Sequence, residues 1–153
     1  MRKTKEIPDV IDNLRRIVET VKQHSRTVEQ KTGLTGPQLW ALKILAGSAP
    51  LRLCELASRM YLRPATTVGI IDRLEGRGLV TRDRSKEDRR AVDIALTEAG
   101  KDVLAKAPEV TQIMLLQGLD QLTEDEFAHV AVGMQLMARI LGAENVKPQP
   151  LHG

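Results

Sequence analysis

Apolar positions recur at alternating spacings of three and four residues along the first part of the chain. Side chains at this spacing share one face of an α-helix, so the pattern predicts a long amphipathic helix over about residues 5–32. Gly33 follows this segment and is expected to end the helix. The stripe consists of Ile7, Val10, Leu14, Ile17, Val21, His24 and Val28, and it is widened by Ile11 and Val18.

Three shorter helices are predicted next. Thr35 and Gln38 have the spacing of a capping box, which predicts the start of a second helix that continues through Leu45. A third helix is expected at about residues 55–60. Pro64 suits the first position of a fourth helix, and the Gly-Arg-Gly sequence at 76–78 is expected to end it.

The pattern then changes from a helical period to the alternation of a strand. Residues 79–82 and 91–96 are predicted to form two antiparallel strands, and the charged segment 83–90 is expected to be the tip of the hairpin between them. The middle of the chain is therefore predicted to be a helix-turn-helix followed by a two-stranded wing, within a fold that is mainly α-helical.

The last third of the chain predicts two further helices. Thr97 can cap a long fifth helix that runs as far as Met114, and Pro108 is expected to bend it because proline lacks a backbone donor. Thr123 and Glu126 form a second capping box, which opens a final helix that ends near Leu141. We expect the first, fifth and last helices to pack together and against the same helices of a second copy. The tail at 145–153 is predicted to be irregular.

Composition narrows the class of protein. The chain has 153 residues, the usual size of one domain, and it holds one Trp, one Tyr, one Phe and one Cys. A single cysteine excludes an internal disulfide, and the absence of an apolar leader predicts a cytoplasmic protein without a membrane segment. The sequence contains no nucleophile elbow, phosphate loop or dinucleotide fingerprint, so we expect neither an enzyme nor a bound cofactor.

Charge is segregated along the chain. The net charge is only +3, yet residues 59–90 carry nine basic and five acidic side chains, whereas residues 101–153 carry four basic and seven acidic ones. A basic, arginine-rich middle segment favours a polyanionic partner.

At this point the chain closely resembles the MarR family of winged helix-turn-helix transcriptional regulators, from the first helix to about Leu141. The segments that carry the resemblance are Leu34-Thr-Gly-Pro-Gln38 with Trp40, Glu55-Leu-Ala57, Ile71-Asp-Arg-Leu-Glu-Gly-Arg-Gly-Leu-Val-Thr-Arg82 and Asp88-Arg-Arg-Ala-Val-Asp-Ile94 with Leu96-Thr-Glu-Ala-Gly100. The resemblance implies a homodimer that binds a pseudo-palindromic operator, represses nearby genes, and is released by a small molecule or an oxidant. It divides the single domain, 1–153, into a DNA-binding lobe at about 35–100 and dimerisation helices at about 5–32 and 101–142.

The wing is expected to contact DNA. An arginine at a hairpin tip can enter the minor groove, so we assign Arg90 to that groove and Asp88 to orienting its guanidinium. The remaining basic residues of the hairpin are expected to contact phosphates, unless the hairpin is merely a solvated, charged turn. They are Arg82, Arg84, Lys86 and Arg89.

The fourth helix is the recognition helix that the resemblance implies. Helical periodicity predicts that Thr67, Ile70, Ile71 and Leu74 are buried, which leaves small or apolar side chains facing outward. Such side chains make few hydrogen bonds to bases, so direct readout is expected to be sparse. Arg73 is expected to contact phosphate, and Arg63 to contact a phosphate or guanine or to remain solvated. The outward positions are Ala65, Thr66, Gly69, Asp72 and Arg73, with Val68 at the edge.

A ligand pocket and a protein partner are the remaining hypotheses. His24 and Trp40 lie where the family forms a pocket, which would accept a small molecule such as an aromatic acid, although both also suit the core. Cys54 is expected to be a buried structural residue, with redox sensing as the alternative. Glu126 with His129 lacks the second pair that a metal site needs. The alternative function is a winged-helix module that docks on another protein without specific DNA binding.

Overall fold

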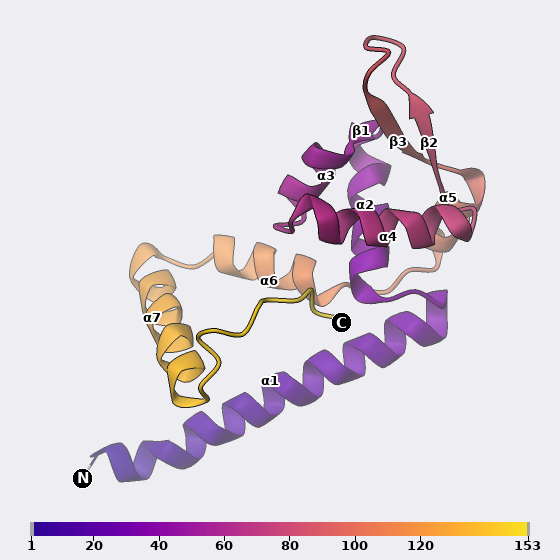
Figure 1. Ribbon diagram of the computed structural model, residues 1–153. Coiled ribbons are helices and arrows are strands. Elements are labelled where there is room, and N and C mark those ends of the chain that lie inside the picture. Colours follow the sequence, from indigo (N-terminus) through magenta and orange to yellow (C-terminus); the bar gives the residue numbers. More distant parts are fainter. Residues whose placement is uncertain (1, 153) are drawn as a thin grey trace.

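The computed structural model describes residues 2–152, in which seven helices and three short strands form a lobe flanked by helices (Figure 1). This confirms the mainly helical class with a small β-wing. The elements are α1 (Arg2–Thr32), α2 (Gly36–Ser48), β1 (Leu51–Arg52), α3 (Leu53–Arg59), α4 (Pro64–Gly76), β2 (Val80–Arg84), β3 (Val92–Leu96), α5 (Glu98–Ala105), α6 (Thr111–Asp120) and α7 (Glu124–Ile140).

Helix α2 lies at the centre of the lobe. The predicted capping box is confirmed: the Thr35 hydroxyl accepts a hydrogen bond from the Gln38 N–H, and Gln38 Oε1 accepts one from the Thr35 N–H at 3.2 Å. The helix is apolar on nearly all sides, as expected of a buried helix, and Leu39, Leu42 and Leu45 are fully buried. It packs against α1, α3, α4, α5, α6 and β3, so it organises the core.

The wing contains one strand more than the sequence predicts. Strands β2 and β3 pair antiparallel, with Val80 opposite Leu96, but β1 joins the other edge of β3 and pairs Leu51 with Ile94. Both Leu51 and Ile94 are buried. A two-residue strand is too short to show alternation in the sequence, and only the position of Ile94 brings Leu51 into the sheet.

The fifth predicted helix is broken rather than bent. The Thr97 cap is confirmed, since its hydroxyl accepts a hydrogen bond from the Gly100 N–H at 3.1 Å, but α5 ends at Ala105 and α6 begins at Thr111. Pro108 lies in the gap, where it removes a helical donor and disfavours helical geometry for the residue before it. Its carbonyl oxygen accepts a hydrogen bond from Lys43 Nζ of α2 at 2.9 Å.

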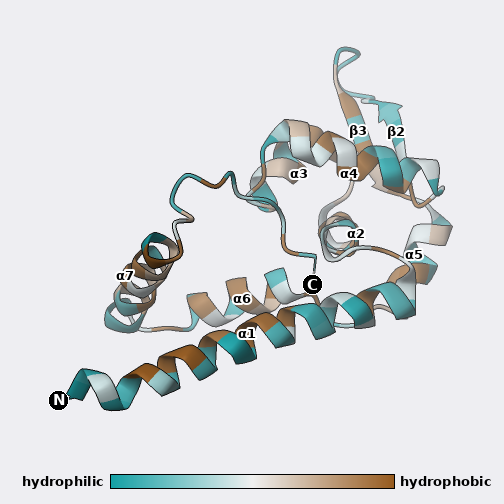
Figure 2. Ribbon diagram, turned by 60° about the horizontal axis from the view of Figure 1, so that its bottom comes forward, coloured by the Kyte–Doolittle hydropathy of each residue, from teal (hydrophilic) through white to brown (hydrophobic). Residues whose placement is uncertain are grey.

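The terminal helices α1 and α7 do not form a common core within this chain, contrary to part of the expectation. Helix α7 starts at the predicted capping box yet buries none of its residues, and α1 buries only Val28. Figure 2 shows apolar segments along both helices. Their packing against a second copy therefore remains a prediction.

The tail is irregular over residues 145–152, as predicted, but it turns back across the molecule after α7 (Figure 1). It reaches the start of α2, where the Gly36 N–H donates to the His152 carbonyl oxygen at 2.7 Å. None of the helices among residues 2–152 has the length and apolar character that spanning a bilayer requires.

We predict that Gly100→Ala destabilises the lobe. A Cβ atom at this position would lie 2.3 Å from the Leu79 carbonyl oxygen, a backbone atom that cannot move without shifting the sheet. The expected loss in free energy of unfolding is about 1–3 kcal/mol. It is measured by urea unfolding at one protein concentration.

Gly47→Ala is the matched control, because nothing lies within 4 Å of its added Cβ. That helical substitution is expected to leave the unfolding free energy unchanged or to raise it by up to about 1 kcal/mol. Equal midpoints for the two variants would contradict the close packing of Gly100.

Candidate nucleic-acid interface

Helix α4 presents two different faces. The predicted buried stripe is confirmed, since Thr67, Ile70, Ile71 and Leu74 are the buried residues of the helix. Pro64 occupies its first turn, and Arg63 at the N-cap makes no side-chain capping bond. The predicted outward face is exposed except for Thr66, which is half-buried. The exposed residues of this face are Ala65, Val68, Gly69, Asp72 and Arg73.

The tip of the hairpin is held by a compact set of hydrogen bonds. The Ser85 N–H donates to the Ala91 carbonyl oxygen at 2.9 Å, and the buried Ser85 hydroxyl accepts from the Glu87 and Asp88 N–H groups. The Ala91 N–H also donates to the Asp88 carbonyl oxygen at 3.0 Å. A small buried serine therefore shapes the turn that carries the arginines.

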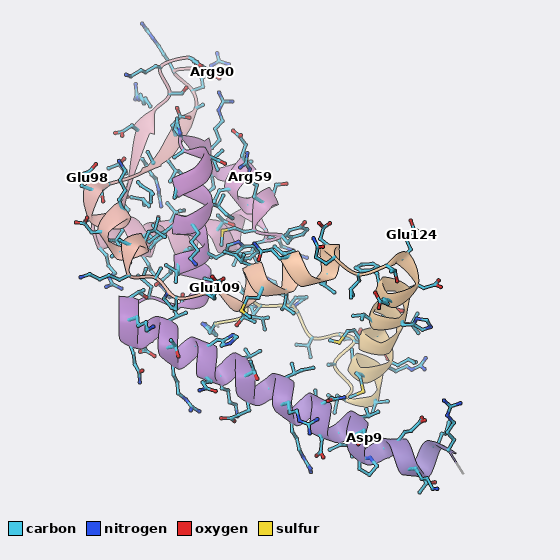
Figure 3. The ribbon with its side chains drawn as sticks, turned by 180° about the vertical axis from the view of Figure 1, so that it is seen from behind. Asp9, Arg59, Arg90, Glu98, Glu109 and Glu124 are labelled. Carbon is cyan, nitrogen blue, oxygen red and sulfur yellow. The ribbon has the colours of Figure 1, made fainter. Side chains whose placement is uncertain are left out.

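Asp88 acts on Arg90 differently from the sequence expectation. Its carboxylate accepts a hydrogen bond from the Arg90 main-chain N–H at 3.0 Å, and not from the guanidinium. A carboxylate two residues earlier reaches the backbone more easily than the end of a long side chain. Asp88 thus fixes the backbone at Arg90 and leaves the guanidinium exposed at the far end of the hairpin (Figure 3).

Arg82 is engaged within the chain rather than available to phosphate. Its guanidinium pairs with the Asp72 carboxylate of α4 and lies 4.0 Å from the Glu75 carboxylate. The sequence predicts a phosphate contact for Arg82. It cannot reveal the internal pairing, because that pairing depends on how β2 lies against α4. The ion pair instead joins the wing to the recognition helix.

Four cations remain exposed on the hairpin, and we call them the basic tip. Among residues 2–152 none of the four lies within 4.0 Å of a carboxylate oxygen. Arg63, just before α4, and Arg73, on α4, are also exposed. The structure therefore provides positive charge both on the wing and along the recognition helix. The basic tip consists of Arg84, Lys86, Arg89 and Arg90.

Two contacts connect the lobe to α1. Arg77, at the end of α4, donates from Nη1 to the Gly33 carbonyl oxygen at 2.6 Å, next to the left-handed Gly33 that ends α1. His24 Nδ1 of α1 lies 2.7 Å from the Thr111 hydroxyl of α6. The orientation of the recognition helix is thus tied to the long helix.

Trp40 and His24 do not share one pocket. Trp40 is almost fully buried but lines a cavity of about 340 Å³ together with the α3–α4 turn, Thr66, two residues of α6 and the tail. His24 is not among the lining residues. Of the two candidate ligand residues, only Trp40 borders this cavity.

Cys54 and Tyr61 are both exposed, which the sequence does not predict. Cys54 is exposed, which corrects the buried role expected for it: α3 directs Leu56, Ala57 and Met60 inward, and Cys54 lies off that face. The sequence pattern does not single out Tyr61. It lies in the α3–α4 turn with a left-handed backbone (φ 55°) and is 77% exposed. An aromatic residue two positions before Arg63 is the signal that could have found it.

The Glu126 side chain is engaged within its own helix. Its carboxylate accepts a hydrogen bond from the Thr123 N–H at 2.9 Å within the capping box of α7. Within residues 2–152 there is no group of three His, Cys, Asp or Glu side chains that could hold a metal ion.

Comparison with known proteins agrees with this arrangement. The MarR family model matches residues 34–92. The uncharacterized HTH-type transcriptional regulator YfiV of Bacillus subtilis is 33% identical over 78% of this chain and 73% of its own length. The HTH-type transcriptional repressor MdtR of the same organism is 27% identical over 91% of this chain and 92% of its own.

A solved structure extends the agreement to the fold. A MepR-like protein crystallised with pseudoligands has a TM-score of 0.59 and 30% identity to this chain, with 90% of this chain and 97% of that one covered. The matched segment, residues 34–92, contains α2, the helix-turn-helix and the basic tip. The protein described here belongs to the MarR family of HTH-type transcriptional regulators.

Proposed function

We propose that this protein is a homodimeric repressor that binds pseudo-palindromic double-stranded DNA through α4 and the β2–β3 hairpin and releases it when a small molecule binds. The observation that carries the proposal is the basic tip. Its four exposed cations lie at the far end of a hairpin joined to the recognition helix by Arg82 and Asp72. Exposed cations without a neighbouring carboxylate provide the affinity for phosphate that such a protein requires.

The contacts divide into positioning and recognition. Arg90, held at its backbone by Asp88, enters the minor groove, while Arg84, Lys86 and Arg89 contact phosphates. In the major groove the methyl groups of Ala65 and Val68 contact thymine methyl groups, with Arg63 and Arg73 on the backbone. Because these side chains make few base-edge hydrogen bonds, Arg90 and DNA shape supply most of the discrimination.

Dimerisation covers the apolar side chains that the terminal helices leave exposed. Ile17 of α1 is 58% exposed, and Met134 and Ile140 of α7 are 62% and 74% exposed. Apolar stripes of this extent mark an interaction surface, and a two-fold axis matches a pseudo-palindromic site.

The effector binds in the cavity beside Trp40. An aromatic acid suits it, because the indole offers a stacking surface and Arg63 and Lys147 on the cavity wall offer positive charge to a carboxylate. Since Arg63 and Thr66 begin the recognition helix, a molecule in this cavity can shift that helix relative to DNA.

We predict that Arg90→Ala lowers discrimination between a duplex selected by the wild-type protein from a random library and unselected DNA. The loss of one minor-groove contact is expected to reduce the affinity ratio about tenfold or more. Fluorescence anisotropy at fixed salt measures the ratio.

Arg89→Ala is the control, since it removes the same charge from the adjacent position. It should weaken binding to both duplexes alike. An Arg90→Ala protein with full discrimination would contradict the minor-groove assignment. A wild-type protein with neither DNA preference nor salt dependence would favour the protein-docking module.

Two arginines of one strand are predicted to behave differently toward salt. Arg84→Gln should reduce the slope of log affinity against log salt concentration by about 1, the amount expected for one phosphate contact. Arg82→Gln should leave the slope unchanged whatever the affinity, because this guanidinium pairs with Asp72. Equal changes in slope would contradict the internal role of Arg82.

The dimer is predicted to dissociate in Met134→Glu, because a charge placed in an apolar interface is left without solvation. Sedimentation velocity should show a monomer where the wild-type protein sediments as a dimer. Gln135→Glu adds the same charge at the neighbouring exposed position and should remain dimeric. A dimeric Met134→Glu variant would place the interface elsewhere.

A further inference from the structure

The tail returns to the lobe instead of extending away from α7. Gly142 adopts a left-handed backbone (φ 66°) just after the helix, and the chain then crosses toward α2 (Figures 1 and 2). Its final contact is the hydrogen bond from the Gly36 N–H to the His152 carbonyl oxygen at 2.7 Å. Gly36 is buried and is the first residue of α2.

This contact satisfies a donor that the helix itself leaves open. The first N–H groups of an α-helix have no intrahelical acceptor, and the Thr35 side chain serves only that of Gln38. A carbonyl from the tail therefore completes the N-terminus of the most buried helix in the molecule.

The tail also lies between α1 and the start of the recognition helix. Residues 147–150 line the cavity beside Trp40, opposite Arg63 and Thr66. Pro150 to His152 line a second hollow, whose other wall is the segment of α1 from Val21 to Arg26. Pro150 belongs to both walls and is half-buried.

The composition of this segment suits docking in an extended form. Residues 147–152 read Lys-Pro-Gln-Pro-Leu-His, with two prolines and no acidic residue. Proline fixes φ and favours extended backbone, so the segment loses less conformational entropy on docking than a flexible peptide of the same length.

We infer that the space between α1 and the lobe is a binding site for the chain's own segment Lys147–His152, and that docking of this segment holds the recognition helix in position for DNA. The second part rests on the proposed DNA-binding function. When the segment leaves, the N-terminus of α2 loses an acceptor, the Trp40 cavity loses one wall, and α4 gains freedom relative to α1. Since a dimer must hold two recognition helices at a fixed separation, this freedom lowers DNA affinity.

The test removes the tail and uses Trp40, the only tryptophan, as the reporter. Truncation after Val146 should shift Trp40 emission to longer wavelength and raise its acrylamide quenching constant about twofold or more, because a residue that is 4% exposed becomes accessible. The affinity for the selected duplex should fall about fivefold, as expected for the loss of roughly one hydrogen bond and its packing.

Rescue in trans separates docking from damage to the fold. A synthetic peptide of residues 147–153, added at about millimolar concentration, the effective concentration of a tethered segment, should restore both Trp40 shielding and DNA affinity in the truncated protein. A scrambled peptide should restore neither. In the full-length chain, Pro150→Ser should show a weaker form of the truncation phenotype, while Asn145→Ser, at an exposed position outside the docked segment, should resemble the wild-type protein.

The outcomes are distinct. Unchanged quenching after truncation would overturn the docking site. Increased quenching with unchanged DNA affinity would overturn the coupling to the recognition helix. Failure of the full-length protein to bind DNA would overturn the proposed function and the coupling, whereas the quenching and peptide results would still decide the docking site.

Discussion

The burial of most of α2 is the constraint on which the rest of the structure depends. Its leucines at 39, 42 and 45 are fully buried, and each contributes about 1.5–3 kcal/mol when removed from water. A helix that is apolar on nearly all sides must be enclosed, so α3, α4, α5 and α6 pack around it and the end of α1 is drawn against it. The inward face of the recognition helix is defined by this packing, and its outward face is what remains.

Polar contacts at the edge of the lobe then fix how the wing, α4 and α1 are oriented relative to one another, which the apolar core alone does not determine. Arg82 pairs with Asp72 and joins the wing to α4, while Arg77 donates to Gly33 and joins α4 to α1. Exposed ion pairs contribute little to stability, so these contacts matter chiefly for orientation. Together they form a continuous connection from the basic tip, through the recognition helix, to the long helix that we propose to lie in the dimer interface.

The lobe buries its apolar side chains within one chain, whereas the terminal helices leave most of theirs exposed. Helix α7 buries none of its residues, and most of the apolar stripe of α1 is exposed. We propose that a second copy covers these helices, because a two-fold dimer provides a symmetrical apolar surface. The tail occupies the junction between the two regions, where its carbonyl completes the first turn of α2. A change at that junction affects both the recognition helix and α1.

Much of the fold was predictable because it is encoded locally. Both capping boxes, the Thr97 cap, the buried stripe of α4 and the two main strands depend on hydrogen bonds and spacings within a few residues. The exposure of most of the candidate residues on α4 and the hairpin followed from the same periodicity. Tertiary structure alone decided the pairing of Leu51 with Ile94, the partner of Arg82, the exposure of Cys54 and the docking of the tail. These features depend on contacts between residues that are far apart in the sequence and meet only after the helices have packed. A local pattern of apolar and polar residues does not determine such contacts.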